Sequence, residues 1–208
     1  KSVATEGGGR PFITKWQGKR GEVLEIPIVG KYQLVIKDES GQEVIKQRVE
    51  IENEKTPYFF VPNADGLYTV EAGPEGVEYM RMTEGCNSKT SLLKVVQFGT
   101  VRWRSMRDMF RGGVRMIFAP DIDTPDLSQV TDMSGMFSGC SAFNQPLEQW
   151  NVGNVENMHG MFSGCSAFNQ PLEGWNAGNV KDMNSMFLEC SAFNQPLEEW
   201  DVGNVTDM

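Results

Sequence analysis

Histidine, closely spaced cysteines and long apolar runs are all scarce in this sequence of 208 residues. The single histidine, His159, occupies a repeat position that is otherwise Ser134 and Asn184, whereas acid–base or nucleophilic catalysis needs several convergent groups. Zinc sites need close cysteine pairs with further histidines, and the sequence offers no such pattern. We therefore predict a protein that is not an enzyme and has no catalytic residue, cofactor or metal ion.

No apolar run approaches the roughly 18 residues that a membrane-spanning helix needs. The apolar fraction of 39% nevertheless suffices for an ordinary packed core, so the chain is not of the disordered class. The sequence opens at Lys1 rather than at a methionine, which we interpret as a removed leader or a trimmed end.

Basic residues are almost missing from residues 132–208, where Lys181 is the only base among ten acidic side chains. This acidic character argues against nucleic-acid binding through that segment. Five arginines gather just before it instead: Arg102, Arg104, Arg107, Arg111 and Arg115. They form either an anion site or, as we favour, ion pairs with nearby aspartates, which are Asp108, Asp121, Asp123 and Asp126.

A unit of 25 residues occurs three times after residue 131. The copies 132–156, 157–181 and 182–206 agree at 16 of 25 positions, and Asp207–Met208 begin a fourth. Such an array predicts a solenoid in which each unit packs against its neighbours. Either the sequence is cut inside a longer array or an unsealed end remains, and an exposed edge of this kind invites self-association.

The apolar spacing within one unit predicts a closed coil with several short sides. Val155 to Phe162 has the pattern of a short helix with Asn154 as its N-cap. Trp150 to Val152 has the spacing of a short strand that pairs in parallel with its copies. Gly139 and Gly164 are the predicted helix stops, and Glu189 replaces them in the third copy.

Identical positions of such coils stack in columns. The three predicted structural columns are Cys140, Cys165 and Cys190; Trp150, Trp175 and Trp200; and Asn144, Asn169 and Asn194. We interpret the cysteines as small buried thiols rather than a metal or disulfide site, and the tryptophans as core rather than a sugar-stacking platform. The asparagines are expected to hydrogen-bond backbone groups at the turns of the coil.

One further column cannot serve stability, because like charges stacked above one another repel. It comprises Glu148, Glu173 and Glu198, which we expect to face solvent. Together with Gln145, Gln170 and Gln195 they form the candidate partner-binding face. A solvated face without a partner is the alternative.

The chain is predicted to have five parts, namely a flexible tail at 1–10, a β-sandwich at 11–82, a connecting segment at 83–100, a degenerate capping coil at 101–131 and the repeats at 132–208. Alternating β-branched and aromatic runs with turn signals between them indicate the sandwich. Met106, 27 residues before Met133, indicates the capping coil. The spacing of Asp121, Asp123 and Asp126 permits calcium but lacks the distal glutamate of a helix-loop-helix site.

The string MFSGCSAFNQPLEQWNVGNV, its two near copies and the lead-in QFGTVRWRSMRDMF resemble the BspA-like leucine-rich-repeat surface proteins of bacteria, in the variant with 25-residue repeats. The front, from PFITKW to LYTVEA, is similar to the small sandwich, akin to polycystic-kidney-disease domains, that often precedes such repeats. The Trp-Gly-Asp-Gly turn of that sandwich is replaced by residues 37–41. The resemblance implies an exported protein on the cell surface, often lipid-anchored, with a role in adhesion.

The predicted fold class is therefore mainly β with short helices, with a small β-sandwich before a leucine-rich-repeat-like solenoid. The predicted function is non-catalytic binding of a protein on host or neighbouring cells through the repeats. A structural spacer on the cell surface and a glycan-binding module are the alternatives. The expected location is extracellular, on the bacterial cell surface.

Overall fold

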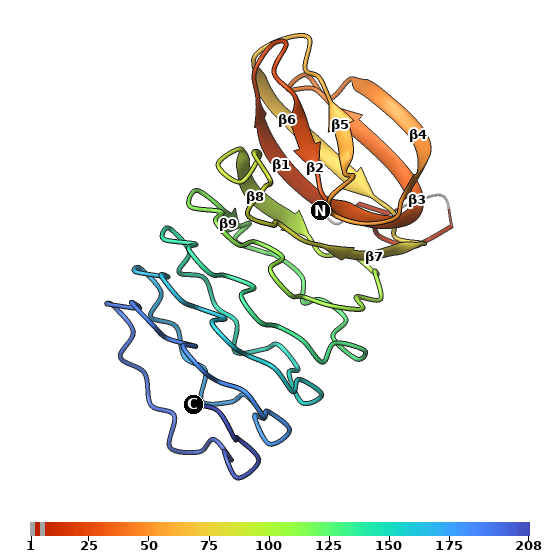
Figure 1. The fold of residues 1–208 in the computed structure, drawn as a ribbon. Helices are drawn as coiled ribbons and strands as arrows, with labels where there is room; N and C mark the ends of the chain where they lie inside the picture. The colour runs from red at the N-terminus through yellow and green to blue at the C-terminus, as the bar shows by residue number, and fades with distance from the viewer. Residues whose placement is uncertain (1–2, 5–6) are drawn as a thin grey trace.

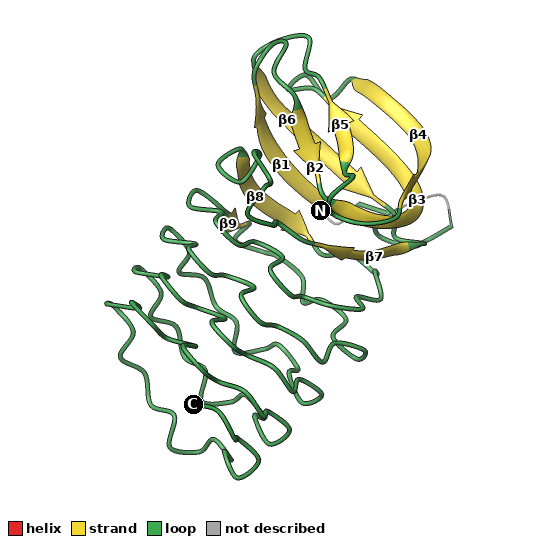
Figure 2. Ribbon diagram, in the orientation of Figure 1, coloured by secondary structure: helices red, strands yellow, loops and turns green. Residues whose placement is uncertain are grey.

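The computed structural model describes residues 3–4 and 7–208, and within these residues it contains strands, turns and bridges but no helix (Figure 2). No element of the described chain could therefore cross a membrane as a helix. The predicted tail at 1–10 lies partly outside the described residues. The strands are β1 (Phe12–Gly18), β2 (Leu24–Ile26), β3 (Ile28–Lys37), β4 (Glu43–Ile51), β5 (Tyr58–Phe60), β6 (Gly66–Ala72), β7 (Val77–Met80), β8 (Leu92–Gln97) and β9 (Ile117–Phe118).

Seven of the strands form one mixed sheet in the order β4-β3-β6-β1-β8-β9, with β7 paired to β3. The pairs are antiparallel except β8 with β9, which is parallel. Strand β3 shows why these segments are extended, because buried Tyr32, Leu34 and Ile36 alternate with exposed or half-buried neighbours. The remaining strands, β2 and β5, form a separate two-stranded antiparallel sheet.

Residues 119–208 contain no named strand, and their chain runs in successive turns that lie one below another (Figure 1). Neighbouring units touch through single parallel bridges, from Asp132 to Asn157, from Asn157 to Asp182 and from Asp182 to Asp207. Backbone hydrogen bonds repeat at the same interval, as in Phe137 N–H to Met161 O and Phe162 N–H to Met186 O, each 2.9 Å. We call residues 132–208 the repeat stack.

The predicted fold class is wrong, since the described chain has no helices and forms one mixed sheet, and no leucine-rich-repeat-like solenoid of strands and helices is present. Val155 to Phe162 does not form a helix, because the N–H groups of Met158, Gly160 and Phe162 donate to carbonyls of the following unit. The side chain of Asn154 therefore caps no helix and donates to Ser128 O at 3.0 Å.

The predicted strand from Trp150 to Val152 is also absent. Trp150 N–H donates to Leu147 O within its own unit at 3.0 Å, so it is not available to a neighbouring coil. At the front, most strands belong to one sheet, which β8 and β9 extend towards the repeat stack, rather than to a self-contained sandwich.

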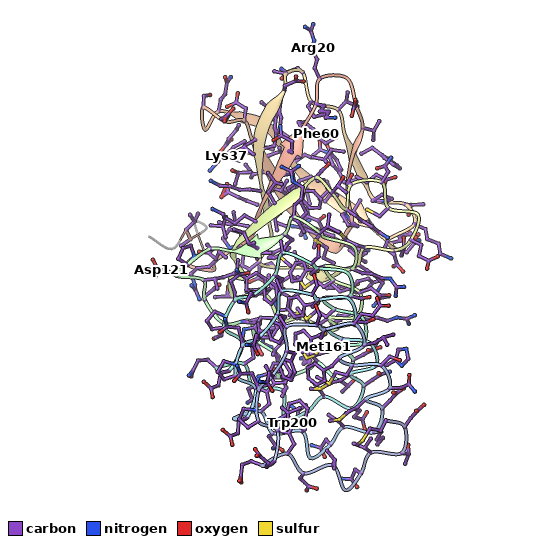
Figure 3. All side chains as sticks on the ribbon, turned by 90° about the vertical axis from the view of Figure 1, so that its left-hand side faces the viewer. Arg20, Lys37, Phe60, Asp121, Met161 and Trp200 are labelled. Atoms are coloured by element: carbon purple, nitrogen blue, oxygen red, sulfur yellow. The ribbon has the colours of Figure 1, made fainter. Side chains whose placement is uncertain are left out.

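A single apolar core runs from the sheet into the repeat stack. Phe98 joins the two parts, with its ring 6.1 Å from Phe12 on β1, 5.4 Å from Phe118 on β9 and 5.5 Å from Trp150 in the first repeat. Figure 3 shows Met161 and Trp200 within the stacked turns, whereas Arg20 points away from the sheet. The repeat stack is thus held at a fixed position on the front sheet.

Candidate functional site

Phenylalanine rings form two columns inside the repeat stack. The centroid of Phe162 lies 5.5 Å from that of Phe137 and 5.7 Å from that of Phe187, with nearly parallel rings. A second column joins Phe143, Phe168 and Phe193 at about the same spacing of 6.0 and 5.9 Å. Equivalent side chains therefore do meet across units, and the rings leave no space along the column for a ligand.

The tryptophans at the predicted column are buried, but only two of them stack on each other. Trp175 and Trp200 lie 6.4 Å apart, and their Nε1–H groups donate to Leu147 O and Leu172 O of the preceding units at 2.9 Å. Trp150 stacks on Phe118 instead, at 6.1 Å. All three side chains are 9% exposed or less, so they present no open ring face for a sugar.

The cysteine column consists of free thiols. Cys140 and Cys165 are buried and Cys190 is half-buried, and the three Sγ atoms donate to Phe110 O, Phe137 O and Phe162 O at 2.7 to 3.0 Å. Burial raises the pKa of the Cys165 thiol to about 12 and that of Cys140 well above the ordinary value. The thiols are therefore protonated at neutral pH and have little nucleophilic character.

The asparagine and glutamine positions form one continuous ladder. Asn144 Oδ1 accepts a hydrogen bond from Asn169 N–H at 2.8 Å and from Gln170 Nε2 at 3.2 Å. Asn169 repeats both bonds with the backbone of Asn194 and the side chain of Gln195. The amides of Gln170 and Gln195, which we predicted as part of a binding face, thus join neighbouring units, and Gln145 Oε1 accepts from Phe118 N–H at 3.3 Å.

The three glutamates of the predicted face remain in solvent. Glu148, Glu173 and Glu198 are exposed, and none has an ion-pair partner among residues 3–4 and 7–208. An exposed ion pair of the repeat stack joins Lys181 Nζ to Glu156 Oε1 at 2.6 Å and involves none of these three glutamates. Of the predicted face, only the glutamate column is therefore free for an outside partner.

A second amide column was missed by the sequence reasoning. The Nδ2 atoms of Asn154, Asn179 and Asn204 donate to carbonyls of the preceding turns, Ser128 O, Gly153 O and Gly178 O, at 2.6 to 3.0 Å. Their invariance in all three copies was the available signal, but the helix prediction assigned Asn154 to a cap. These amides join neighbouring turns and stabilise the stack.

A shallow groove of about 400 Å³ crosses the repeat units on another side. Its lining is Arg107, Asp132, Ser134, Asn157, His159 and Asp182. The polar groups are largely satisfied by local turns, because Asp132 Oδ1 and Asn157 Oδ1 accept from backbone N–H groups two residues later. His159 Nδ1 lies 3.7 Å from Asp182 Oδ1. Within the described chain, no cluster of three or more metal-ligating side chains occurs.

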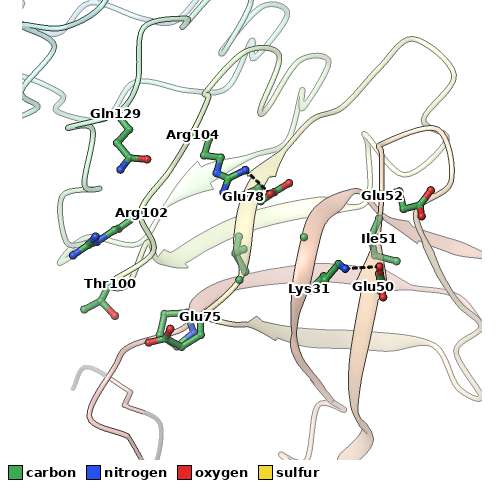
Figure 4. A pocket seen from close by; sticks show the side chains of 14 residues that line it. Lys31, Glu50, Ile51, Glu52, Glu75, Glu78, Thr100, Arg102, Arg104 and Gln129 are labelled. Atoms are coloured by element: carbon green, nitrogen blue, oxygen red, sulfur yellow. Dashed lines mark hydrogen bonds and ion pairs between the residues drawn. The ribbon is translucent and has the colours of Figure 1, made fainter.

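A cleft of about 730 Å³ lies where β3, β4 and β7 meet the turn before the repeats (Figure 4). Its charges are mostly paired, as in Lys31 with Glu50 at 2.8 Å and Arg104 with Glu78 at 2.6 Å. Arg102 lines the same cleft. The cleft surface therefore carries both positive and negative side chains, and these do not converge on a single ligand.

The arginine and aspartate clusters at the junction bind each other and the backbone. Asp108 pairs with Arg107 and Arg111 at 3.7 and 3.4 Å. Among the described residues it is the one predicted aspartate that pairs with these arginines, because Asp123 pairs with Arg10 and Arg104 with Glu78. Asp123 accepts from the N–H groups of Phe98 and Gly99. A hydrogen bond from Ser128 lowers the pKa of Asp126. These aspartates serve different turns and do not converge on a cation.

Comparison with curated proteins and with solved structures gave no match to this chain. Residues 93–208, which are more than half of the sequence, match a family described as "Mycoplasma protein of unknown function, DUF285". The matched segment begins in β8 and includes the turn before the repeats and the whole repeat stack. The chain therefore belongs to the DUF285 family.

Proposed function

We propose that this protein is a non-catalytic binding protein of the bacterial cell surface, and that the exposed glutamate column contacts a protein on a host or neighbouring cell. The proposal rests on three exposed glutamates that occupy the same position in adjoining units, Glu148, Glu173 and Glu198. No positive charge pairs with them among the described residues. Like charges on neighbouring units oppose folding, whereas the repeated asparagines and glutamines beside them hydrogen-bond to the next unit. A repeated acidic surface of this kind fits a basic partner.

The resemblance to BspA-like surface proteins supports the location and the class of function. Membership of the DUF285 family agrees with the bacterial source that this resemblance implies. We also propose that the front segment is related to the domains akin to polycystic-kidney-disease domains that precede repeats in such proteins. An exported protein with these parts would present the repeat stack to other cells.

The test is a charge reversal of the column. The variant Glu148→Lys, Glu173→Lys, Glu198→Lys is compared with Glu22→Lys, Glu43→Lys, Glu75→Lys, which reverses three exposed charges among residues 11–82 and has the same net charge. Each protein is immobilised, and its retention of extracellular host proteins and of whole cells is measured at low and physiological salt. We expect the column variant to lose at least tenfold in binding and the control to keep it.

Equal binding by both variants would refute the glutamate column as the binding surface. A loss of binding in both variants would show that binding depends only on the overall charge of the protein. If the unaltered protein retains no partner, the structural spacer is the better description, because its repeat stack then serves only to hold the front sheet at a distance. Retention that free monosaccharides abolish would favour glycan binding instead.

A further inference from the structure

The outer face of the seven-stranded sheet carries a row of lysines. Residues that are paired in register on neighbouring strands share a face, and the row runs through Lys37 of β3, Thr69 of β6, Lys15 of β1 and Lys94 of β8. Neighbouring strands lie about 4.8 Å apart, so the row from Lys37 to Lys94 is about 14 Å long. All four residues are half-buried, whereas their neighbours on the other face of the sheet belong to the core.

Like charges meet without compensation in this row. Lys15 and Lys94 are direct cross-strand neighbours, which is a destabilising arrangement for two ammonium groups. Neither lysine forms an ion pair within residues 3–4 and 7–208. Lys37, at the other end of the row, is paired with Glu71 at 2.8 Å. Folding therefore gains nothing from lysine at both positions of the opposed pair.

More cations lie beside the row on the same face. The register of β3 with β4 adds Lys31, Lys46 and Arg48. Three of the six cations are paired with carboxylates, namely Lys31 with Glu50, Lys37 with Glu71 and Lys46 with Glu43. The other three, Lys15, Arg48 and Lys94, have no ion pair in the described part of the chain, so these six cations and three carboxylates leave a net charge of +3 on this face.

The residues between the cations narrow the chemistry of an anionic partner. Gln17, Gln33 and Thr69 lie on the same face and offer hydrogen-bond donors and acceptors that suit hydroxyl groups. The aromatic residues of β1, β3 and β6 lie on the opposite face and are at most 2% exposed: Phe12, Trp16, Tyr32 and Tyr68. The outer face of these strands therefore offers no ring on which a nucleic-acid base stacks.

We propose that this surface, the lysine face (Lys15, Gln17, Gln33, Lys37, Arg48 and Lys94), binds a linear acidic polysaccharide whose sulfate or carboxylate groups lie along the row. A linear polyanion holds condensed counterions, and their release on binding adds to the affinity. Isolated surface ion pairs with the carboxylates of a protein contribute much less.

The acidity of the repeat stack does not prevent such binding. At physiological ionic strength, exposed charges that are more than about 8 Å apart are largely screened from each other. The lysine face is also a different surface from the glutamate column, so each of them can bind its partner without the other.

The probe is immobilised heparin, a sulfated polysaccharide. Hyaluronan, which carries carboxylates alone, separates the two kinds of anionic group, and neutral dextran is the blank. The affinity of the full chain is measured at several salt concentrations between about 50 and 300 mM. We expect binding to heparin, to hyaluronan or to both, and none to dextran. Three unpaired cations predict that the logarithm of the affinity falls with the logarithm of the salt concentration with a slope of about −2 to −3.

The variant Lys15→Gln, Lys94→Gln removes the opposed pair. Its control is Lys19→Gln, Lys55→Gln, which removes the same charge from two exposed positions outside the strands. We expect the first variant to bind the polysaccharide at least tenfold more weakly, with a salt slope reduced by about 1 to 2, and the control to change less than twofold. Because the two ammonium groups repel each other, Lys15→Gln, Lys94→Gln should melt at the same or a higher temperature than the unaltered protein, so unfolding would not explain the loss.

Three results would overturn the proposal: no binding to heparin or hyaluronan at about 50 mM salt, equal binding to dextran, or equal weakening by the two variants. Tighter binding of a single-stranded oligothymidine than of either polysaccharide would assign the lysine face to a nucleic acid instead. Sedimentation velocity at low salt tests a second copy as the anion. Self-association that is lost both in Lys15→Gln, Lys94→Gln and in the charge reversal of the glutamate column would show that the repeat stack of another copy covers the lysine face.

Discussion

Replacing the same ring in two successive units tests whether stacking between units stabilises this protein. Phe162 is fully buried, with ring centroids of Phe137, Phe168 and Phe187 at 5.5, 4.4 and 5.7 Å. Phe187 has the equivalent neighbours Phe162 and Phe193 but no ring of a following unit among the described residues, and it is half-buried. Phe162→Ala should therefore destabilise the fold more than Phe187→Ala, although the sequence around the two rings is nearly identical.

The magnitudes follow from burial. Truncation of a fully buried phenylalanine costs about 3–5 kcal/mol, because the apolar surface is lost and a cavity remains. The exposed face of Phe187 is already in water and its removal leaves an open notch rather than a cavity, so we expect about half of that cost. The difference between the variants should be about 1–3 kcal/mol.

Urea denaturation measures both free energies of unfolding, followed by the fluorescence of the buried tryptophans, three of which lie in the repeat stack. Hydrogen exchange at Gly160 and Phe162, whose N–H groups bond to the third unit, identifies local opening that the global transition does not show. Equal destabilisation by the two variants, or a larger loss for Phe187→Ala, would refute the view that each unit is stabilised by the next.

Alkylation of the native protein should modify the half-buried Cys86 and Cys190 before the buried Cys140 and Cys165, and mass spectrometry after timed quenching gives the order. Because burial raises the pKa of Cys165 to about 12, its alkylation should accelerate about tenfold per pH unit between pH 7 and 9, and rapid modification at pH 7 would contradict this burial. Asn169→Ala removes the acceptor for both Asn194 N–H and Gln195 Nε2 and should cost about 1–3 kcal/mol of unfolding free energy. The exposed Asn151→Ala, which loses a single turn contact, should cost less than about 1 kcal/mol in the same thermal melts, and a reversed order would refute the ladder.

The front strands were largely predictable because their signal is local. Buried Tyr32, Leu34 and Ile36 alternate with less buried residues along β3, most of them polar, and a period of two identifies a strand with one buried face. Their assembly into one mixed sheet was not predictable, because β8 pairs with β1 and β9 from far along the chain. Register between distant segments depends on contacts that no local pattern contains.

Of the candidate site, the sequence identified the positions that recur but not the direction of each side chain. Glu148 faces solvent, as like-charge repulsion predicts, whereas Gln170 turns to the preceding unit because Asn144 offers it two acceptor oxygens. The helix expected from Val155 to Phe162 fails for the same reason, since the N–H of Phe162 finds a better-placed carbonyl at Met186 than within its own turn. The spacing of apolar residues is compatible both with a helix and with hydrogen bonds to the next unit.

The sequence alone thus determined the 25-residue period, the apolar interior of the units and the acidity of their surface, because these are properties of composition and spacing. Tertiary structure alone decided how the backbone groups of the repeats are paired. In a unit too short to satisfy its own N–H and carbonyl groups, the partners come from the units before and after it. That dependence removes the helix that the pattern predicts.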